Sequence, residues 1–240
     1  MKLAHLTASA SALALLAACG GGESAAPESD APAPPPPVEA AAAETDYAPL
    51  EEVSAANYSL ERTHAFLTWK VGHSGGLSSY RVAFTDYDAD LQFDPETPEN
   101  SSLTVTINPM GVVSNYPLDY KAGHADSEFE TWDEDISRNA RWLNADEHPE
   151  ITFTSTAVER TGEDTGTVTG DLAFLGQTLP VTLDVTFNGN GNAAWFGERD
   201  LIGFDATTTI NRSDFGMTAA IPNISDEVVI EFSGEFLQDE

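Results

Sequence analysis

From Asn57 onward, apolar and polar residues alternate in short segments that are separated by turn residues. A period of two residues predicts β-strands that have one apolar face and one polar face. Many such strands in succession favour an all-β fold, an antiparallel barrel or sandwich, over an α/β fold. The expected strands cover residues 65–71, 80–93, 103–108, 151–158, 167–174, 181–188, 203–211 and 228–236.

Two glycine-containing segments are typical of turns between these strands. Gly176 lies where the chain reverses, and Pro180 follows at the start of the next strand, where its missing N–H costs least. The segment Asn188–Gly191 reads Asn-Gly-Asn-Gly, and these residues accept the positive φ angles that hairpin turns demand. We therefore expect the chain to turn at both places.

One region departs from the two-residue period. Between Ser127 and Ala145, apolar residues recur at a spacing of three and four, which predicts an amphipathic helix or two short turns. The recurring residues are Phe129, Trp132, Ile136, Ala140 and Leu143. We expect this segment to cap one end of a barrel.

The segment Val168–Phe174, its glycine turn and the Pro-Val-Thr-Leu segment Pro180–Leu183 form a motif that resembles the YceI-like family. A second match is Asn211–Gly216, which reads Asn-Arg-Ser-Asp-Phe-Gly, and Phe93–Pro95 is a weaker one. The resemblance extends over residues 57–236. It implies an antiparallel lipocalin-like β-barrel that holds a polyisoprenoid chain.

The N-terminal segment is typical of an export signal. Residues 1–18 carry an early lysine, an apolar Leu/Ala run and small residues, followed by Cys19. Leu16–Cys19 resembles the lipobox of bacterial lipoproteins, in which the cysteine becomes the lipidated first residue. An ordinary signal peptide that ends near a cysteine is the alternative. Cys19 is the single cysteine of the chain, so we expect lipidation there and no disulfide in the folded domain.

Three parts follow from this pattern: a signal peptide at 1–18, a lipidated cysteine with a disordered Ala/Pro/Glu linker at 19–56, and the barrel domain at 57–240. Lipidation predicts a protein anchored to the membrane of the cell envelope. Position 20 is glycine rather than the aspartate that resembles an inner-membrane retention signal. We therefore expect the outer membrane, facing the periplasm.

Charge and motif spacing narrow the classes of function. The net charge of −30 argues against a nucleic-acid partner and against docking on anionic lipid, and solubility explains it simply. Asp86, Asp88 and Asp90 look like a calcium loop, but Leu91 and Thr97 stand where such a loop needs Gly and Glu. The histidines lack zinc-ligand spacing, and no serine lies in a nucleophile elbow. We expect no metal, no cofactor and no catalysis.

A binding tunnel is the remaining interpretation. Apolar residues on the inner faces of the expected strands would line it, although parity alone does not separate a hollow barrel from a solid core. The resemblance favours a hollow one. The expected lining residues are Leu67, Trp69, Phe93, Phe153, Leu172, Phe174 and Leu183.

His64, His73 and Arg81 are expected to meet the ligand headgroup, and Arg212 is a further candidate for ligand binding. Family members tend to have histidines where His64 and His73 stand, near the barrel mouth, and arginines where Arg81 and Arg212 stand. Counting by two from the inward-facing leucine at 91 also places Arg81 on the inner face, provided that no bulge intervenes. For Arg212, an ion pair with Asp214 is the alternative.

The sequence departs from the family at 133–136, where Asp-Glu-Asp-Ile replaces the usual Arg-Asp-x-His. A polyprenyl diphosphate needs charge-assisted bonds from Arg or Lys. We therefore expect a neutral-headed isoprenoid, a quinone or a polyprenol, bound without chemistry. Two alternatives stay open: a structural lipoprotein whose solid barrel recruits an envelope protein through 127–145, and an envelope enzyme that acts on lipids. A homodimer is compatible with the sequence, which does not set the oligomeric state.

Overall fold

The structure is a computed structural model that describes residues 50, 53–192 and 194–240. The expected signal peptide, the expected lipidation site at Cys19 and nearly all of the predicted linker lie outside the described residues. Within the described part, no helix combines the length and the apolar character that crossing a membrane requires.

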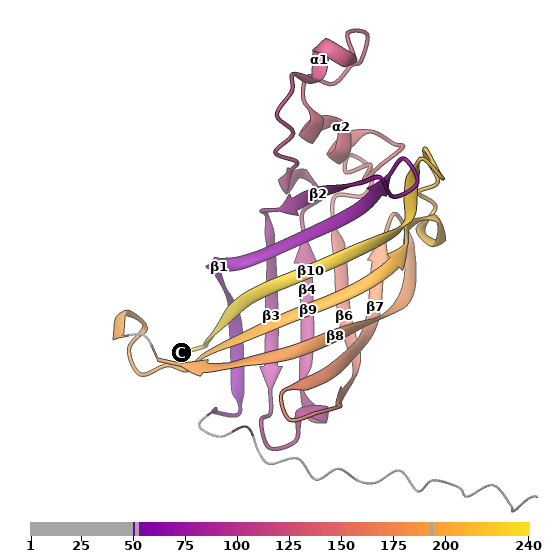
Figure 1. Ribbon diagram of the computed structural model, residues 1–240. Coiled ribbons are helices and arrows are strands. Elements are labelled where there is room, and N and C mark those ends of the chain that lie inside the picture. Colours follow the sequence, from indigo (N-terminus) through magenta and orange to yellow (C-terminus); the bar gives the residue numbers. More distant parts are fainter. Residues whose placement is uncertain (1–49, 51–52, 193) are drawn as a thin grey trace, which may run out of the picture. The chain divides into compact units, whose positions relative to one another are not determined.

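A single antiparallel sheet closes into a barrel (Figure 1). Its strand order is β10-β9-β8-β7-β6-β4-β3-β1, and β10 pairs with β1 to complete the circle. The all-β, lipocalin-like fold expected from the sequence is thereby confirmed. The wall strands are β1 (Ala56–His73), β3 (Tyr87–Phe93), β4 (Ser102–Ile107), β6 (Ile151–Arg160), β7 (Thr165–Phe174), β8 (Gln177–Gly191), β9 (Leu201–Asn211) and β10 (Ile224–Gln238).

Two further strands extend this wall. The second half of β1 pairs with β2 (Ser78–Phe84), which in turn pairs with the short β5 (Val112–Val113). The first half of β1 pairs with β3 instead. The long β1 thus spans both parts of the wall, whereas the sequence pattern indicates only its second half.

The expected strand at 80–93 is two strands. Thr85 and Asp86 interrupt it: the Thr85 N–H donates to the carbonyl of Gly111, and the Asp86 carboxylate accepts from the Asn108 amide. The alternation is out of phase across this break, because the buried residues of β3 have odd numbers and the buried residue of β2 has an even one. Tyr80, Val82 and Phe84 face the interior in β2.

The two expected turns have different outcomes. Leu175 and Gly176 both have positive φ, at 49° and 76°, and they join the paired residues Phe174 and Gln177 in a two-residue hairpin, as predicted. The expected hairpin at 188–191 is wrong, because β8 continues to Gly191. Gly189, with φ of 113°, lies instead at a register shift in the pairing of β8 with β9.

Two short helices lie beyond one end of the barrel (Figure 1). They are α1 (Tyr120–Gly123) and α2 (Trp132–Arg138). The Thr131 hydroxyl caps α2 by accepting from the Glu134 N–H at 3.1 Å. Turns follow α2, so the amphipathic segment expected at 127–145 is one short helix with turns rather than one long helix. The single-turn 3₁₀ helices are η1 (Pro98–Asn100), η2 (Pro109–Gly111), η3 (Ala194–Phe196) and η4 (Arg212–Phe215).

Candidate functional site: two apolar cavities inside the barrel

The interior next to α2 contains a cavity of about 200 Å³, which we call the helix-end cavity. Alternate residues of the strands supply its wall, and Trp132 and Ile136 of α2 contribute from the barrel end. Among the residues predicted from sequence, it is lined by Leu67, Trp69, Leu172, Phe174 and Arg212.

A second cavity of about 130 Å³ lies further along the same strands, and Leu50 of the predicted linker contributes to its lining. We call it the linker-end cavity. Phe93 and Leu183, both predicted as tunnel residues, line it together with Leu103, Val168 and Phe204. Phe93 packs edge-on against Phe204, with 5.6 Å between ring centroids. The two cavities give the barrel an apolar interior that is not completely filled.

Phe153 is the one predicted tunnel residue that lines neither cavity. It is only 6% exposed and packs in the buried cluster of the helix end with Leu172 and Phe174. Its ring lies over Gly170 of the neighbouring strand, where an added Cβ would be 2.5 Å from the ring Cζ. Sequence parity therefore placed this side chain on the inner face, but whether it reaches a cavity depends on packing.

Two of the residues that line the helix-end cavity carry polar donors without protein acceptors. The indole N–H groups of Trp69 and Trp132 are buried and have no hydrogen-bond partner among the described residues. Both side chains line the cavity. A buried donor without an acceptor costs free energy, so a ligand that supplies an acceptor there would be favoured.

Aromatic rings cluster around Trp132 at this end of the barrel. Its ring lies edge-on against Tyr120 and His124, with centroids 5.1 and 4.9 Å away, and Tyr116 is 4.7 Å away. Such clusters hold large side chains in fixed orientations. The sequence signal for Trp132 was its place in the helical period. Trp142, from a turn, and Met217, from the loop after η4, also line this cavity, and neither carried a signal in the sequence.

Arg212 lies in the helix-end cavity wall, but its guanidinium is bound to the backbone. It is 2% exposed and donates to the carbonyl oxygens of Ser225, Met217, Ala219 and Ile224 at 2.8–3.1 Å. Burial lowers the pKa of this group, and nearby Asp226 partly offsets the shift. Among the described residues, Arg212 forms no ion pair with Asp214, so this alternative prediction is wrong.

Arg81, expected inside the barrel, is on the outside. Its side chain is 60% exposed, and its Nη1 forms an ion pair of 2.8 Å with Glu231. The reason is the break at Thr85 and Asp86, which shifts the inward parity of β2 relative to β3. This is the bulge condition on which the sequence prediction depended.

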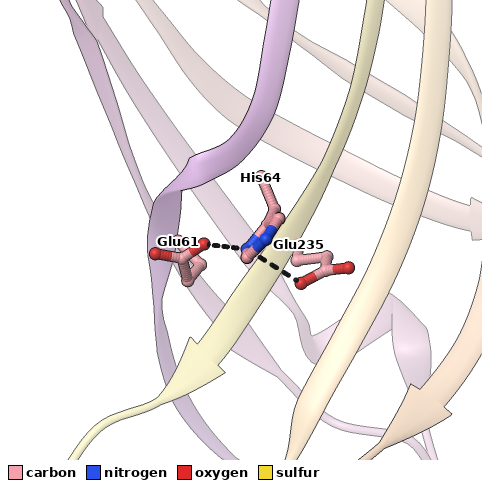
Figure 2. A group of neighbouring side chains, drawn as sticks. All are labelled: Glu61, His64 and Glu235. Carbon is pink, nitrogen blue, oxygen red and sulfur yellow. Dashed lines mark hydrogen bonds and ion pairs between the residues drawn. The ribbon is translucent and has the colours of Figure 1, made fainter.

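His64, expected near the barrel mouth, also lies on the outer wall. Between the pairs Glu61–Glu235 and Ala65–Gly234, β1 bulges out of register with β10. The bulge brings the imidazole Nδ1 of His64 to the Glu61 carboxylate and to within 3.7 Å of Glu235 (Figure 2). His73 is exposed at the end of β1, where its Nδ1 lies 3.0 Å from the Ser74 hydroxyl. Neither histidine lines a described cavity.

Glu61, His64 and Glu235 form a group that could hold a metal ion (Figure 2). Their potential ligand atoms all lie within 4.8 Å of one another. Carboxylate and imidazole suit zinc. Burial raises the pKa of Glu61, but hydrogen bonds from Thr63 and His64 outweigh it and lower the pKa overall. These bonds already compensate the Glu61 carboxylate, so the cluster is explained as an ion-pair network that stabilises the bulge.

Comparison with known proteins identifies the family of this barrel. The YceI-like domain matches residues 58–236. A UPF0312 protein of Pseudomonas putida is 39% identical over 180 residues, which are 74% of this chain and 85% of that protein. One of Pseudomonas fluorescens is 37% identical over 198 residues, with coverage of 82% and 94%.

Solved structures show the same fold. The Campylobacter jejuni YCEI protein is 26% identical, with a TM-score of 0.57 over 68% of this chain and 88% of that chain. Burkholderia cenocepacia BcnA, at 22% identity and a TM-score of 0.60 over 73% and 98%, shares the fold. The match over nearly the whole barrel and the identity to these relatives show that the chain belongs to the YceI-like family.

Proposed function

We propose that this protein binds a long-chain isoprenoid lipid with a neutral headgroup, a quinone or a polyprenol, inside its barrel, and that it performs no chemistry on it. The observation that carries the proposal is the pair of apolar cavities along one barrel axis. Apolar pockets with few polar groups are typical of lipid sites. The headgroup would lie in the helix-end cavity, and the isoprenoid tail would extend along the barrel interior toward the linker-end cavity.

The polar groups of the helix-end cavity support a neutral headgroup. The indole donors of Trp69 and Trp132 match the carbonyl oxygens of a quinone, which only accept hydrogen bonds, or the hydroxyl oxygen of a polyprenol. A diphosphate would need free cationic donors. Arg212 is bound to backbone carbonyls, Arg81 is outside, and the acidic Asp135 contributes to the cavity lining.

The cell envelope is the compartment that we propose for this activity. The support is the sequence of residues 1–19, with a signal-peptide layout and Cys19 at a lipobox-like position. Two or more acyl chains on the cysteine would anchor the protein durably to a membrane. The barrel would then exchange lipids with that membrane or with the periplasmic space.

Native mass spectrometry with lipid extraction, on the full-length protein purified from its own membranes, tests this function. A stoichiometric isoprenoid adduct is expected, and its mass distinguishes a neutral head from a diphosphate. An empty protein that takes up neither added quinone nor added polyprenol would contradict the proposal and favour the structural lipoprotein. Equal or tighter competition by a polyprenyl diphosphate at physiological salt would contradict the neutral headgroup alone.

A further inference from the structure

The bulge in β1 places a histidine beside two carboxylates at the seam of the barrel, where β1 and β10 pair to close the sheet. Glu61 and Glu235 are direct partners across these two strands, and the bulge that begins after Glu61 contains His64. The three side chains lie close together on the outer wall (Figure 2). Two carboxylates that stand opposite each other across a strand pair repel, which destabilises the pair. A cation between them would remove this cost.

The cations of the protein balance this pair only in part. A protonated His64 carries one positive charge against two negative ones. Its contact with the Glu235 carboxylate, at 3.7 Å, is too long for a hydrogen bond. Arg62, which follows Glu61 in the chain, forms its ion pair with Asp86. Within the described part of the chain, the ion-pair network therefore accounts for Glu61 and leaves Glu235 without a hydrogen-bonded cationic partner.

We propose that Glu61, His64 and Glu235 form a zinc site that links β1 to β10 on the outer wall of the barrel. Zinc binds imidazole nitrogen and carboxylate oxygen in tetrahedral geometry at about 2.0–2.2 Å, so its ligand atoms are about 3.3 Å apart. The Nδ1 of His64 lies 2.5 Å from the Glu61 carboxylate and 3.7 Å from the Glu235 carboxylate, one distance below this spacing and one above it. Small rotations of the three side chains would bring them to bonding distance. Water would fill the fourth position, because the His64 side chain is 54% exposed.

Thr63 holds one of the three ligands in place. Its hydroxyl lies 2.8 and 2.7 Å from the two carboxylate oxygens of Glu61 and donates to that group. Hydrogen bonds of this kind orient metal ligands, and their loss weakens metal binding by about 10–100-fold. Imidazole suits zinc, whereas magnesium and calcium prefer oxygen ligands alone, so His64 gives the site its preference for zinc.

The sequence predicts no metal, because its histidines lack zinc-ligand spacing. The structure supplies the ligands from the first and the last strand of the barrel wall, so no local motif indicates them. A ligand that binds the folded protein and not the unfolded chain stabilises the fold. Zinc bound by β1 and β10 together should therefore strengthen the barrel at its seam.

The experiment measures zinc binding by the full-length protein, freed of metal with a chelator, in equilibrium dialysis against ZnCl₂ with an excess of MgCl₂. His64→Ala and Glu235→Gln each remove a ligand, and Thr63→Val removes the orienting hydroxyl. The matched controls are His73→Ala, at the end of the same strand, and Glu231→Gln, on β10, because both side chains lie outside the site. Urea unfolding with and without ZnCl₂ checks that each variant folds and measures the stabilisation by zinc.

The expected result is one zinc ion per chain in the wild type and in both controls. His64→Ala, Glu235→Gln and Thr63→Val should each weaken binding at least about tenfold. Zinc should raise the urea midpoint of the wild type and leave that of His64→Ala unchanged.

Three outcomes would overturn the assignment: equal zinc binding by the wild type and His64→Ala, displacement of zinc by excess magnesium, or no zinc binding by the wild type. The three ligands line neither cavity, so each of these outcomes leaves the proposed lipid binding to its own test.

Discussion

Arg212 donates a hydrogen bond of 2.8 Å from its Nε to the carbonyl oxygen of Ser225. Three more bonds from the same guanidinium tie the segment after η4 to the start of β10. The single arginine that lines the helix-end cavity is thus a brace for the barrel end. Because its guanidinium is bound to backbone carbonyls, we expect Arg212 to contribute to the stability of the barrel end rather than to ligand binding.

Replacing Arg212 with methionine should lower the free energy of unfolding by about 2–4 kcal/mol, because four partly buried carbonyl oxygens lose their donor. Urea unfolding measures the change. The control is Arg81→Met, which removes an exposed ion pair and should cost less than about 1 kcal/mol. Equal effects of the two substitutions would contradict the brace.

Gly170→Ala should destabilise the barrel by about 1–3 kcal/mol, since overpacking a site that neighbouring atoms already fill forces side chains and backbone to shift. The new Cβ would be 2.5 Å from both the Phe153 ring and the carbonyl oxygen of Thr154. Combination with Phe153→Leu should recover part of the loss, which a double-mutant cycle in urea measures. A purely additive double variant would show that the ring does not lie over Gly170.

A charge on the cavity wall should abolish lipid retention. Leu172→Asp in the helix-end cavity and Leu183→Asp in the linker-end cavity both place a carboxylate in an apolar lining. Native mass spectrometry of variants that circular dichroism shows to be folded measures the retained lipid. The matched control is Leu77→Asp, because Leu77 is 87% exposed in the described structure. Full retention in a folded Leu172→Asp variant would exclude the assigned cavity.

Tyr58 should make stability fall in alkali. Burial, together with the nearby carboxylate of Asp200, raises the pKa of Tyr58 from 10.0 to about 12, and its hydroxyl donates to the carbonyl of Ser54 at 2.8 Å. Between these values the unfolded chain loses the proton and the folded chain keeps it, so stability decreases as pH rises from 10 toward 12. Urea unfolding across this range should show a smaller decrease for Tyr58→Phe. An unchanged slope would contradict the shifted pKa.

Cys19→Ser should release the protein from the membrane fraction into the soluble fraction of the envelope, because the acyl anchor has no other attachment site of this kind in the sequence. Fractionation followed by immunoblotting measures the distribution. Ser24→Ala, close to the cysteine, is the control that should leave the distribution unchanged. Membrane retention of Cys19→Ser would remove the support for a lipid anchor.

The sequence by itself determined the architecture of this protein. Strict alternation in segments such as Val168–Phe174 and Val181–Phe187 specifies strands with a wet and a dry face, because the side chains of a strand point alternately to its two sides. The Leu175–Gly176 turn could be predicted for the same local reason: glycine accepts the positive φ that the hairpin needs. The resemblance to the family motif indicated that these strands form a lipocalin-like barrel.

The tertiary structure decided which of the candidate site residues face the interior. The alternation changes phase at the break between β2 and β3, which leaves Arg81 on the outer wall, and a bulge in β1 brings His64 against Glu61 and Glu235 there. Backbone carbonyls distant in sequence captured Arg212, and a glycine on a neighbouring strand determined where the Phe153 ring lies. Breaks, bulges and cavities arise from contacts between strands far apart in the chain, and a local pattern of apolar and polar residues does not encode such contacts.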